Sequence, residues 1–174
     1  MNKTILLERL QNERDRFELL LNQIGFARQL TMKGVLGRLT VKDLLADVLS
    51  RQQFIADRLS EVLYGETYSP STSFTALEKF QNEYGYPDYE SSLTEKDKPH
   101  PYIIELYKNV ALDEIVSQEL AVYASIVEAL NSLTHHQFLD HDLFHRIAEH
   151  TYRPYRRTSS AIQRWIKKTA SESK

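Results

Sequence analysis

The residues best suited to chemistry in this sequence are polar side chains at positions where helical periodicity predicts an apolar residue. Glu119 and Gln52 each interrupt the apolar stripe of a predicted long helix near its middle. The two other predicted long helices are interrupted in the same way, at Glu13 (or Arg14 in an alternative register) and at Thr151, Tyr155 and Thr158. Each long helix is therefore expected to bring polar groups to its inner face.

A carboxylate and a phenol on inner helix faces could perform acid–base chemistry. Burial of an unpaired carboxylate costs several kcal/mol, so Glu119 must either pair with other inner residues or line a hydrated cavity. If burial raises its pKa toward neutrality, Glu119 could serve with Tyr155 as a general acid or base. The alternative is that one end of the helices splays apart and these residues meet solvent.

Histidines form a second group of candidate residues, at positions 135, 136, 141, 145 and 150. His141, His145 and Glu149 follow one another at intervals of four, which places them on one helical face. Two imidazoles and a carboxylate could bind a divalent metal. Histidines in a solvated first turn explain the same spacing, and the prediction is that the protein has no metal site.

Composition excludes several classes of function. The 174 residues carry a formal net charge of -2 and no cysteine, so thiolate catalysis and cysteine-ligated zinc are impossible. Acidic residues are interspersed with the basic ones, and the basic cluster at 153–168 is read as a solvated helix face, so no nucleic-acid partner is predicted. No membrane span or signal peptide is recognised, and a cytoplasmic protein is expected.

Periodicity predicts an all-α chain. Long helices are expected at about 4–24, 40–65, 112–131 and 142–169, and short helices at 74–84 and 102–108 in the connection between the second and third long helices. Thr40 and Asp43 form a capping box at the start of the second long helix. The prediction is one domain over residues 1–174, a four-helix bundle with a long connection.

The last predicted helix contains Pro154. A proline inside a helix removes a backbone donor and crowds the carbonyl four residues earlier, here that of His150, at a cost of about 3 kcal/mol. The expectation is a kinked helix, with the freed carbonyl bonded by water or by a hydroxyl such as that of Thr151 or Thr158.

Two stretches resemble the ClbS/DfsB family of four-helix bundle proteins. "HTYRPYRRTSSAIQRWIKK" is similar to the family's last helix through Thr151, Tyr155, Ile162 and Trp165, although His150 stands where the family has asparagine. "GVLGRLTVKDLLADVLSRQQF" is similar to its entry into the second helix. The resemblance covers nearly the whole chain and implies a DinB-like fold.

The wider DinB-like group includes many proteins that hold a metal with one histidine from the second helix and two from the fourth. Here Asp47 occupies the first of these positions, and Pro154 and Thr158 occupy the other two. Too few nitrogen ligands remain for a tight transition-metal site, so no cofactor is expected.

Taken together, the residues and the resemblance favour a small-molecule hydrolase or resistance protein that needs no metal. The expected catalytic residues are Glu119 and Tyr155, and the expected ligand-binding residues are Glu13, Asp47, Gln52, Tyr123, His150, Thr151 and Thr158. One alternative is a non-catalytic bundle that binds a ligand or a protein, and another is a metal-dependent DinB-like transferase using Asp47 and the histidines at 141–150. The resemblance also implies a homodimer.

Overall fold

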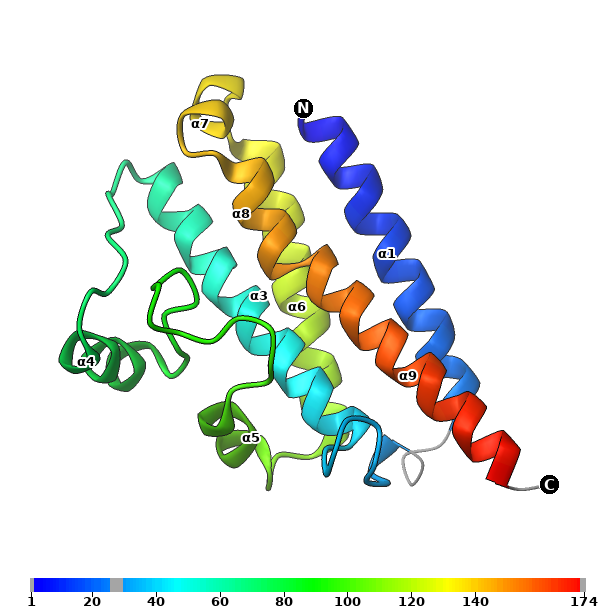
Figure 1. Ribbon diagram of the computed structural model, residues 1–174. Coiled ribbons are helices and arrows are strands. Elements are labelled where there is room, and N and C mark those ends of the chain that lie inside the picture. Colours follow the sequence, from blue (N-terminus) through cyan, green and yellow to red (C-terminus); the bar gives the residue numbers. More distant parts are fainter. Residues whose placement is uncertain (1, 26–29, 173–174) are drawn as a thin grey trace.

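The computed structural model describes residues 2–25 and 30–172, and these residues form helices and loops with no strand (Figure 1). A single isolated bridge joins Leu36 and Leu39 before the second long helix. The elements in chain order are α1 (Lys3–Ile24), α3 (Val41–Leu63), α4 (Phe74–Tyr84), α5 (Pro101–Tyr107), α6 (Leu112–Ser132), α7 (His135–Asp140), α8 (Leu143–His150) and α9 (Tyr152–Glu172). The all-α prediction is confirmed.

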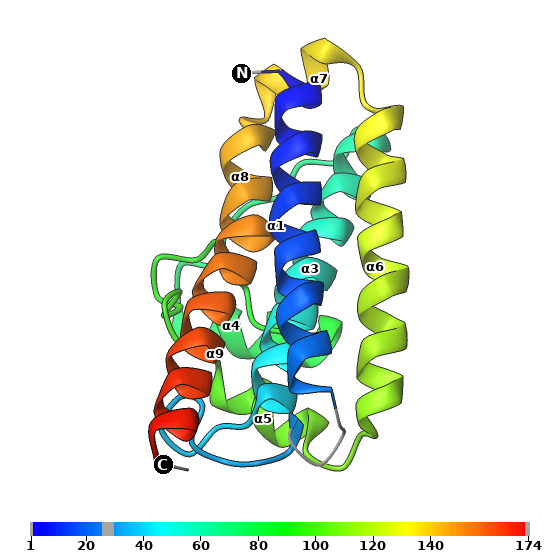
Figure 2. The ribbon, with the colours of Figure 1, turned by 90° about the vertical axis from the view of Figure 1, so that its right-hand side faces the viewer.

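The long helices lie side by side and enclose one core. The α3 helix packs along α6, and α1 packs along α9; these are the most extensive helix pairings. Figure 2 shows α1 between α9 and α6, with α3 behind it. The α8 helix packs against both α3 and α9, so the last part of the chain closes the core on that side.

The start of α3 is fixed by its own sequence. The Thr40 hydroxyl accepts a hydrogen bond from the Asp43 backbone N–H at 3.0 Å, and the Asp43 carboxylate accepts one from the Thr40 N–H at 2.9 Å. This is the predicted capping box, which satisfies two backbone donors that no helical carbonyl can reach. The helix that follows carries much of the core, including Val48, Leu49 and Ile55, which have no exposed surface.

The prediction of one continuous helix at 142–169 is wrong, because the helix is interrupted at Thr151. The backbone of Thr151 has φ -126° and ψ -83°, which ends α8 at His150 and begins α9 at Tyr152. Pro154 is therefore the third residue of α9. The first four N–H groups of a helix have no partner within it, so a proline there removes no hydrogen bond. The Thr151 hydroxyl donates to the Ile147 carbonyl, not to that of His150.

The connection between α3 and α6 carries the expected short helices α4 and α5. It is attached to α3 through aromatic residues around the buried Arg58. The guanidinium carbon of Arg58 lies 4.7 Å from the ring centre of Tyr68, 5.3 Å from that of Phe80 and 5.2 Å from that of Tyr84. Such cation–π contacts are most favourable where water is excluded, as it is at Arg58.

None of the helices in the described ranges has the length and apolar content that crossing a membrane requires.

The short α7 helix was not predicted from periodicity. It places His135 and His136 in its first turn, and Thr134 caps it by accepting a hydrogen bond from the Gln137 N–H at 3.1 Å.

Candidate functional site

A buried hydrogen-bonded network joins the four helices α1, α3, α6 and α9, each of which contributes one residue. The members are Arg14, Gln52, Glu119 and Tyr155, none of which is more than 5% exposed. Convergence of Gln52, Glu119 and Tyr155 was predicted from the interrupted stripes. Each sits on its helix at the centre of the apolar face, so the same packing that buries the core brings these polar groups together. We refer to these four residues as the Glu119 network.

Glu119 is the acceptor at the centre of this network. Arg14 donates from Nη2 to Glu119 Oε2 at 2.8 Å and from Nη1 to Oε1, a bidentate pair that matches the fork of a guanidinium to a carboxylate. Gln52 Nε2 donates to Oε1 at 3.2 Å, and the Tyr155 hydroxyl donates to the same oxygen at 2.5 Å. The Tyr155 oxygen in turn accepts from Arg14 Nη1 at 2.6 Å.

These contacts shift the pKa values of Arg14 and Tyr155. Burial alone lowers the pKa of Arg14, but the hydrogen bond and charge of Glu119 outweigh it and raise that pKa above its usual value. Burial raises the pKa of the Tyr155 phenol, and the negative charge of Glu119 raises it further. At neutral pH the network therefore contains a charged guanidinium and a neutral phenol, both of which donate hydrogen bonds to Glu119.

The inward-facing residue of α1 is Arg14, and the assignment of Glu13 to the interior is wrong. Glu13 is only partly buried, and its Oε1 accepts hydrogen bonds from Nε and Nη2 of Arg156 at 2.9 and 2.7 Å. Neighbouring residues on a helix point in directions about 100° apart. The packing of α1 on α9 therefore places Glu13 at the edge of the core and points Arg14 toward Glu119.

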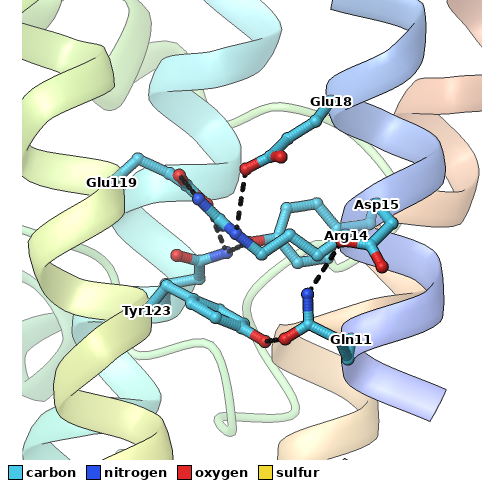
Figure 3. Close-up of polar contacts among 8 residues, drawn as sticks. Gln11, Arg14, Asp15, Glu18, Glu119 and Tyr123 are labelled. Atoms are coloured by element: carbon cyan, nitrogen blue, oxygen red, sulfur yellow. Dashed lines mark hydrogen bonds and ion pairs between the residues drawn. The ribbon is translucent and has the colours of Figure 1, made fainter. Parts of the chain in front are cut away.

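Tyr123 lies against the network without joining its hydrogen bonds. Its ring centre is 4.1 Å from the guanidinium carbon of Arg14, which covers one face of that group (Figure 3). The Tyr123 hydroxyl donates to Gln11 Oε1 at 2.9 Å. Tyr123 therefore shields and orients the arginine, and it is not among the residues that line the adjacent cleft between α1 and α6.

A cleft of about 350 Å³ lies against the Glu119 network. Arg14 and Glu119 form its buried polar wall, and the half-exposed Glu18 faces Arg14 with its Oε1 3.4 Å from Nε (Figure 3). The rest of the lining is mainly apolar and comes from Phe17, Leu21, Leu30, Leu45, Val116 and Leu120, together with Asn22 and Gly25. The cleft thus places a polar group at one end of an apolar hollow between α1 and α6.

The predicted single cavity lined by five inner residues is not what forms. Of Gln52, Glu119, Thr151, Tyr155 and Thr158, only Glu119 lines the cleft. Gln52 and Tyr155 are fully buried behind it. The Thr151 hydroxyl donates a hydrogen bond to the Ile147 carbonyl of α8. Thr158 is buried on α9, 7% exposed, outside the cleft. Gln52 and Tyr155 donate to the Glu119 carboxylate, as the cost of burying a carboxylate requires, whereas Gln52 Oε1 is buried without a hydrogen-bond partner among the described residues.

Asp47 and His150 belong to a second polar cluster, away from Glu119. Arg51 Nε donates to both carboxylate oxygens of Asp47 at 3.2 and 3.1 Å, and Arg51 Nη2 donates to the Lys98 carbonyl at 3.1 Å. His150 is 2% exposed and packs on Phe54 with ring centres 5.1 Å apart. Burial, and then the charge of Arg51, lowers the pKa of His150 to about 3.

No group of three or more histidine, aspartate or glutamate side chains gathers within residues 2–25 and 30–172 in a way that could hold a metal ion. The carboxylate of Asp47 is already paired with the guanidinium of Arg51, so it is not available as a metal ligand. His145 is exposed and lies 3.9 Å from Asp142. The arrangement therefore gives no support to a metal on His141, His145 and Glu149.

Sequence reasoning missed Glu18 and the apolar lining of the cleft. Glu18 follows Arg14 by four positions, a spacing at which ion pairs form on one helix face, so this contact had a recognisable signal. Val116 and Leu120, 37% and 50% exposed at the cleft, had none, because the periodicity of one helix does not show that its apolar residues line a cleft against another helix.

Comparisons with protein-family models, with curated proteins and with solved structures found no match. The functional evidence for this chain is therefore the chemistry of its own residues. The strongest feature is the adjacency of the Glu119 network and the apolar cleft, because either one without the other would be ordinary in a helical protein.

Proposed function

We propose that this protein binds a small molecule in the cleft between α1 and α6. The single observation that supports this proposal is a hollow of about 350 Å³, apolar over most of its lining, that ends on a buried ion pair. Small-molecule sites are typically concave and mostly apolar, with volumes of about 300–1,000 Å³ and a few fixed polar groups. The Arg14–Glu119 pair is such a group, since hydrogen bonds to Gln52 on α3 and Tyr155 on α9 hold it in place.

The fold proposal is a DinB-like four-helix bundle of the ClbS/DfsB type, cytoplasmic and bacterial. Its support is the resemblance of the α3 entry and of the last helix, together with the long α3–α6 connection that carries α4 and α5. Fold alone does not assign a function, so the residues that line the cleft must indicate the ligand.

Hydrolysis in the same cleft is a second proposal, and one observation favours it. Glu119 Oε2 accepts a hydrogen bond from Arg14 Nη2, whereas Oε1 accepts three, so Oε2 retains capacity to accept a proton from water. Because Arg14 donates hydrogen bonds to both carboxylate oxygens, the geometry suits a general base, one of the two roles expected from sequence. Tyr155 is fully buried and would position Glu119 without touching a substrate.

A ligand-observed NMR screen of small aromatic and aliphatic molecules tests the binding proposal. Leu120→Trp should abolish binding, because a bulky ring at this half-exposed position fills the cleft while leaving the core intact. The matched control is Leu19→Trp, at a 66% exposed position of α1 outside the cleft. Binding that survives Leu120→Trp would place the site elsewhere.

The hydrolysis proposal needs a separate readout. Molecules that bind in the screen are incubated with the protein and followed by mass spectrometry for the gain of one water. Loss of turnover in Glu119→Gln, with binding retained in correctly folded protein, is the expected result. Binding without any turnover would leave the protein as a non-catalytic binder, the alternative function.

A further inference from the structure

The charges of the cleft do not balance. The charged residues in its lining are Arg14, Glu18 and Glu119, one cation and two carboxylates, so the lining carries one net negative charge. All other lining residues are uncharged. A hollow with mainly apolar walls concentrates the field of such a charge, and it attracts ligands of the opposite sign.

The single cation is already engaged. Arg14 Nη1 donates to Glu119 and Tyr155, Nη2 donates to Glu119, and Nε faces Glu18 at 3.4 Å. The ring of Tyr123 covers one face of the guanidinium at 4.1 Å. An anionic ligand would have to displace a carboxylate from this arginine, at the cost of leaving that carboxylate unpaired.

The carboxylates, in contrast, have capacity to spare. Glu18 has a side chain 50% exposed, and its contact with Arg14 uses Oε1. Glu119 Oε2 accepts its described hydrogen bond from Arg14 Nη2. A positively charged nitrogen near Glu18 could therefore gain an ion pair while staying partly hydrated, and an attached apolar body would reach Leu21, Leu45 and Leu120.

We infer that the cleft selects molecules with a protonated amine on an apolar body and discriminates against the corresponding acids. This inference rests on the proposed function, because it concerns the same cleft. It goes further by naming the chemical class of the ligand and by giving Glu18 a role in specificity.

The test uses probes that share one body and differ in head group: 4-phenylbutylamine, 4-phenylbutanol and 4-phenylbutyrate. Each is titrated into the full chain and followed by NMR. The amine should bind most tightly and the acid least tightly. Glu18→Gln should weaken amine binding about two- to fivefold, the range of a partly exposed ion pair, and should leave alcohol binding unchanged. Added salt should weaken amine binding only.

The control variant is Glu8→Gln, which removes the same charge from an exposed position of α1 outside the cleft and should change none of the three affinities. Acid binding equal to or tighter than amine binding would overturn the inference while keeping the cleft as a site. An unchanged amine affinity in Glu18→Gln would also overturn it. Failure of all three probes, or binding insensitive to Leu120→Trp, would instead contradict the proposed function itself.

Discussion

At the scale of single residues, the partners of Glu119 determine what its replacement does. A carboxylate on a cavity wall could be neutralised with little effect on folding, and sequence alone favours that outcome. In the structure, Glu119→Gln would remove the buried bidentate partner of Arg14 and leave it only the half-exposed Glu18 at 3.4 Å. We expect the free energy of unfolding to fall by about 3–5 kcal/mol, measured by urea denaturation.

The control for this prediction is Glu114→Gln, an exposed position on the same helix, which should change stability by less than about 0.5 kcal/mol. The double variant Arg14→Met, Glu119→Leu should be less destabilised than Glu119→Gln, because replacing both charges with apolar groups removes the desolvation cost of each. A double variant as unstable as the sum of its single changes would mean that the pair is not coupled.

A second prediction at the residue scale concerns His150 and the pH dependence of the free energy of unfolding. Its pKa is about 3 in the folded chain, against an ordinary value of 6.5, because burial and the charges of Arg51, Lys96, Arg146 and Arg157 disfavour the imidazolium. The unfolded chain therefore binds this proton more tightly. The stability that neutral His150 contributes is complete above about pH 6.5 and is lost as the pH falls toward 3.

The measurement is the free energy of unfolding between pH 7 and pH 4. Glu90, whose Oε1 lies 3.9 Å from His150, already accepts a hydrogen bond from Arg146 and so offsets little of the repulsion. His150→Asn should reduce the pH dependence by up to several kcal/mol over this range, even if it lowers stability at pH 7. A pH dependence in His150→Asn equal to that of the unmodified chain would contradict this prediction.

At the scale of elements, the break between α8 and α9 changes the expected effect of Pro154. A proline within a continuous helix would cost about 3 kcal/mol, and Pro154→Ala would recover most of it. In the first turn of α9 no backbone donor is lost, and the fixed φ of proline suits a helix start. We therefore expect Pro154→Ala to change the free energy of unfolding by less than about 1 kcal/mol in urea denaturation.

A gain near 3 kcal/mol in Pro154→Ala would show instead that the helix runs through Thr151 in solution. Ser160→Ala provides the comparison, since it makes a similarly small change in the interior of α9, where no proline effect can arise.

The elements that sequence predicted best are those whose apolar stripe and end signals agree. α3 is the clearest case, because Thr40 and Asp43 mark its start and its stripe is unbroken except at Gln52. The α8–α9 break was missed because Thr151 and Tyr155 keep the helical phase across it. Their side chains remain on the inner face although the backbone hydrogen bonding is interrupted.

The Glu119 network was predicted in its parts but not in its pairing. Periodicity identifies which face of a helix a residue lies on, so Gln52, Glu119 and Tyr155 could be placed inside. It does not decide between neighbouring registers, and the choice between Glu13 and Arg14 needed the packing of α1 on α9. Without Arg14, the carboxylate had no counter-ion and a hydrated cavity was the natural expectation. The cleft depends on how α1 and α6 face each other, which no single helix encodes.

At the scale of the whole molecule, the resemblance to ClbS/DfsB proteins predicts a homodimer, and exposed apolar side chains offer a surface for it. Tyr64 and Phe74 flank the loop between α3 and α4 and are 81% and 76% exposed. No residue of the α4 helix is fully buried, and α4 contacts α3 through Phe80 and Tyr84 (Figure 1). A two-fold symmetric contact buries the same patch on both copies, which is the commonest route to a soluble dimer.

We expect light scattering at tens of micromolar protein to give about twice the chain mass of 20.3 kDa. If Phe74 lies in the contact, Phe74→Lys should shift the mass to that of a single chain, because two copies would each bring a charge to one apolar interface. Leu139→Lys, on α7 and 55% exposed, is the matched change outside this surface and should leave the dimer intact. A single-chain mass for the unmodified protein would contradict the dimer. Dissociation by Leu139→Lys alone would move the interface from the α3–α4 loop to the α7 end of the molecule.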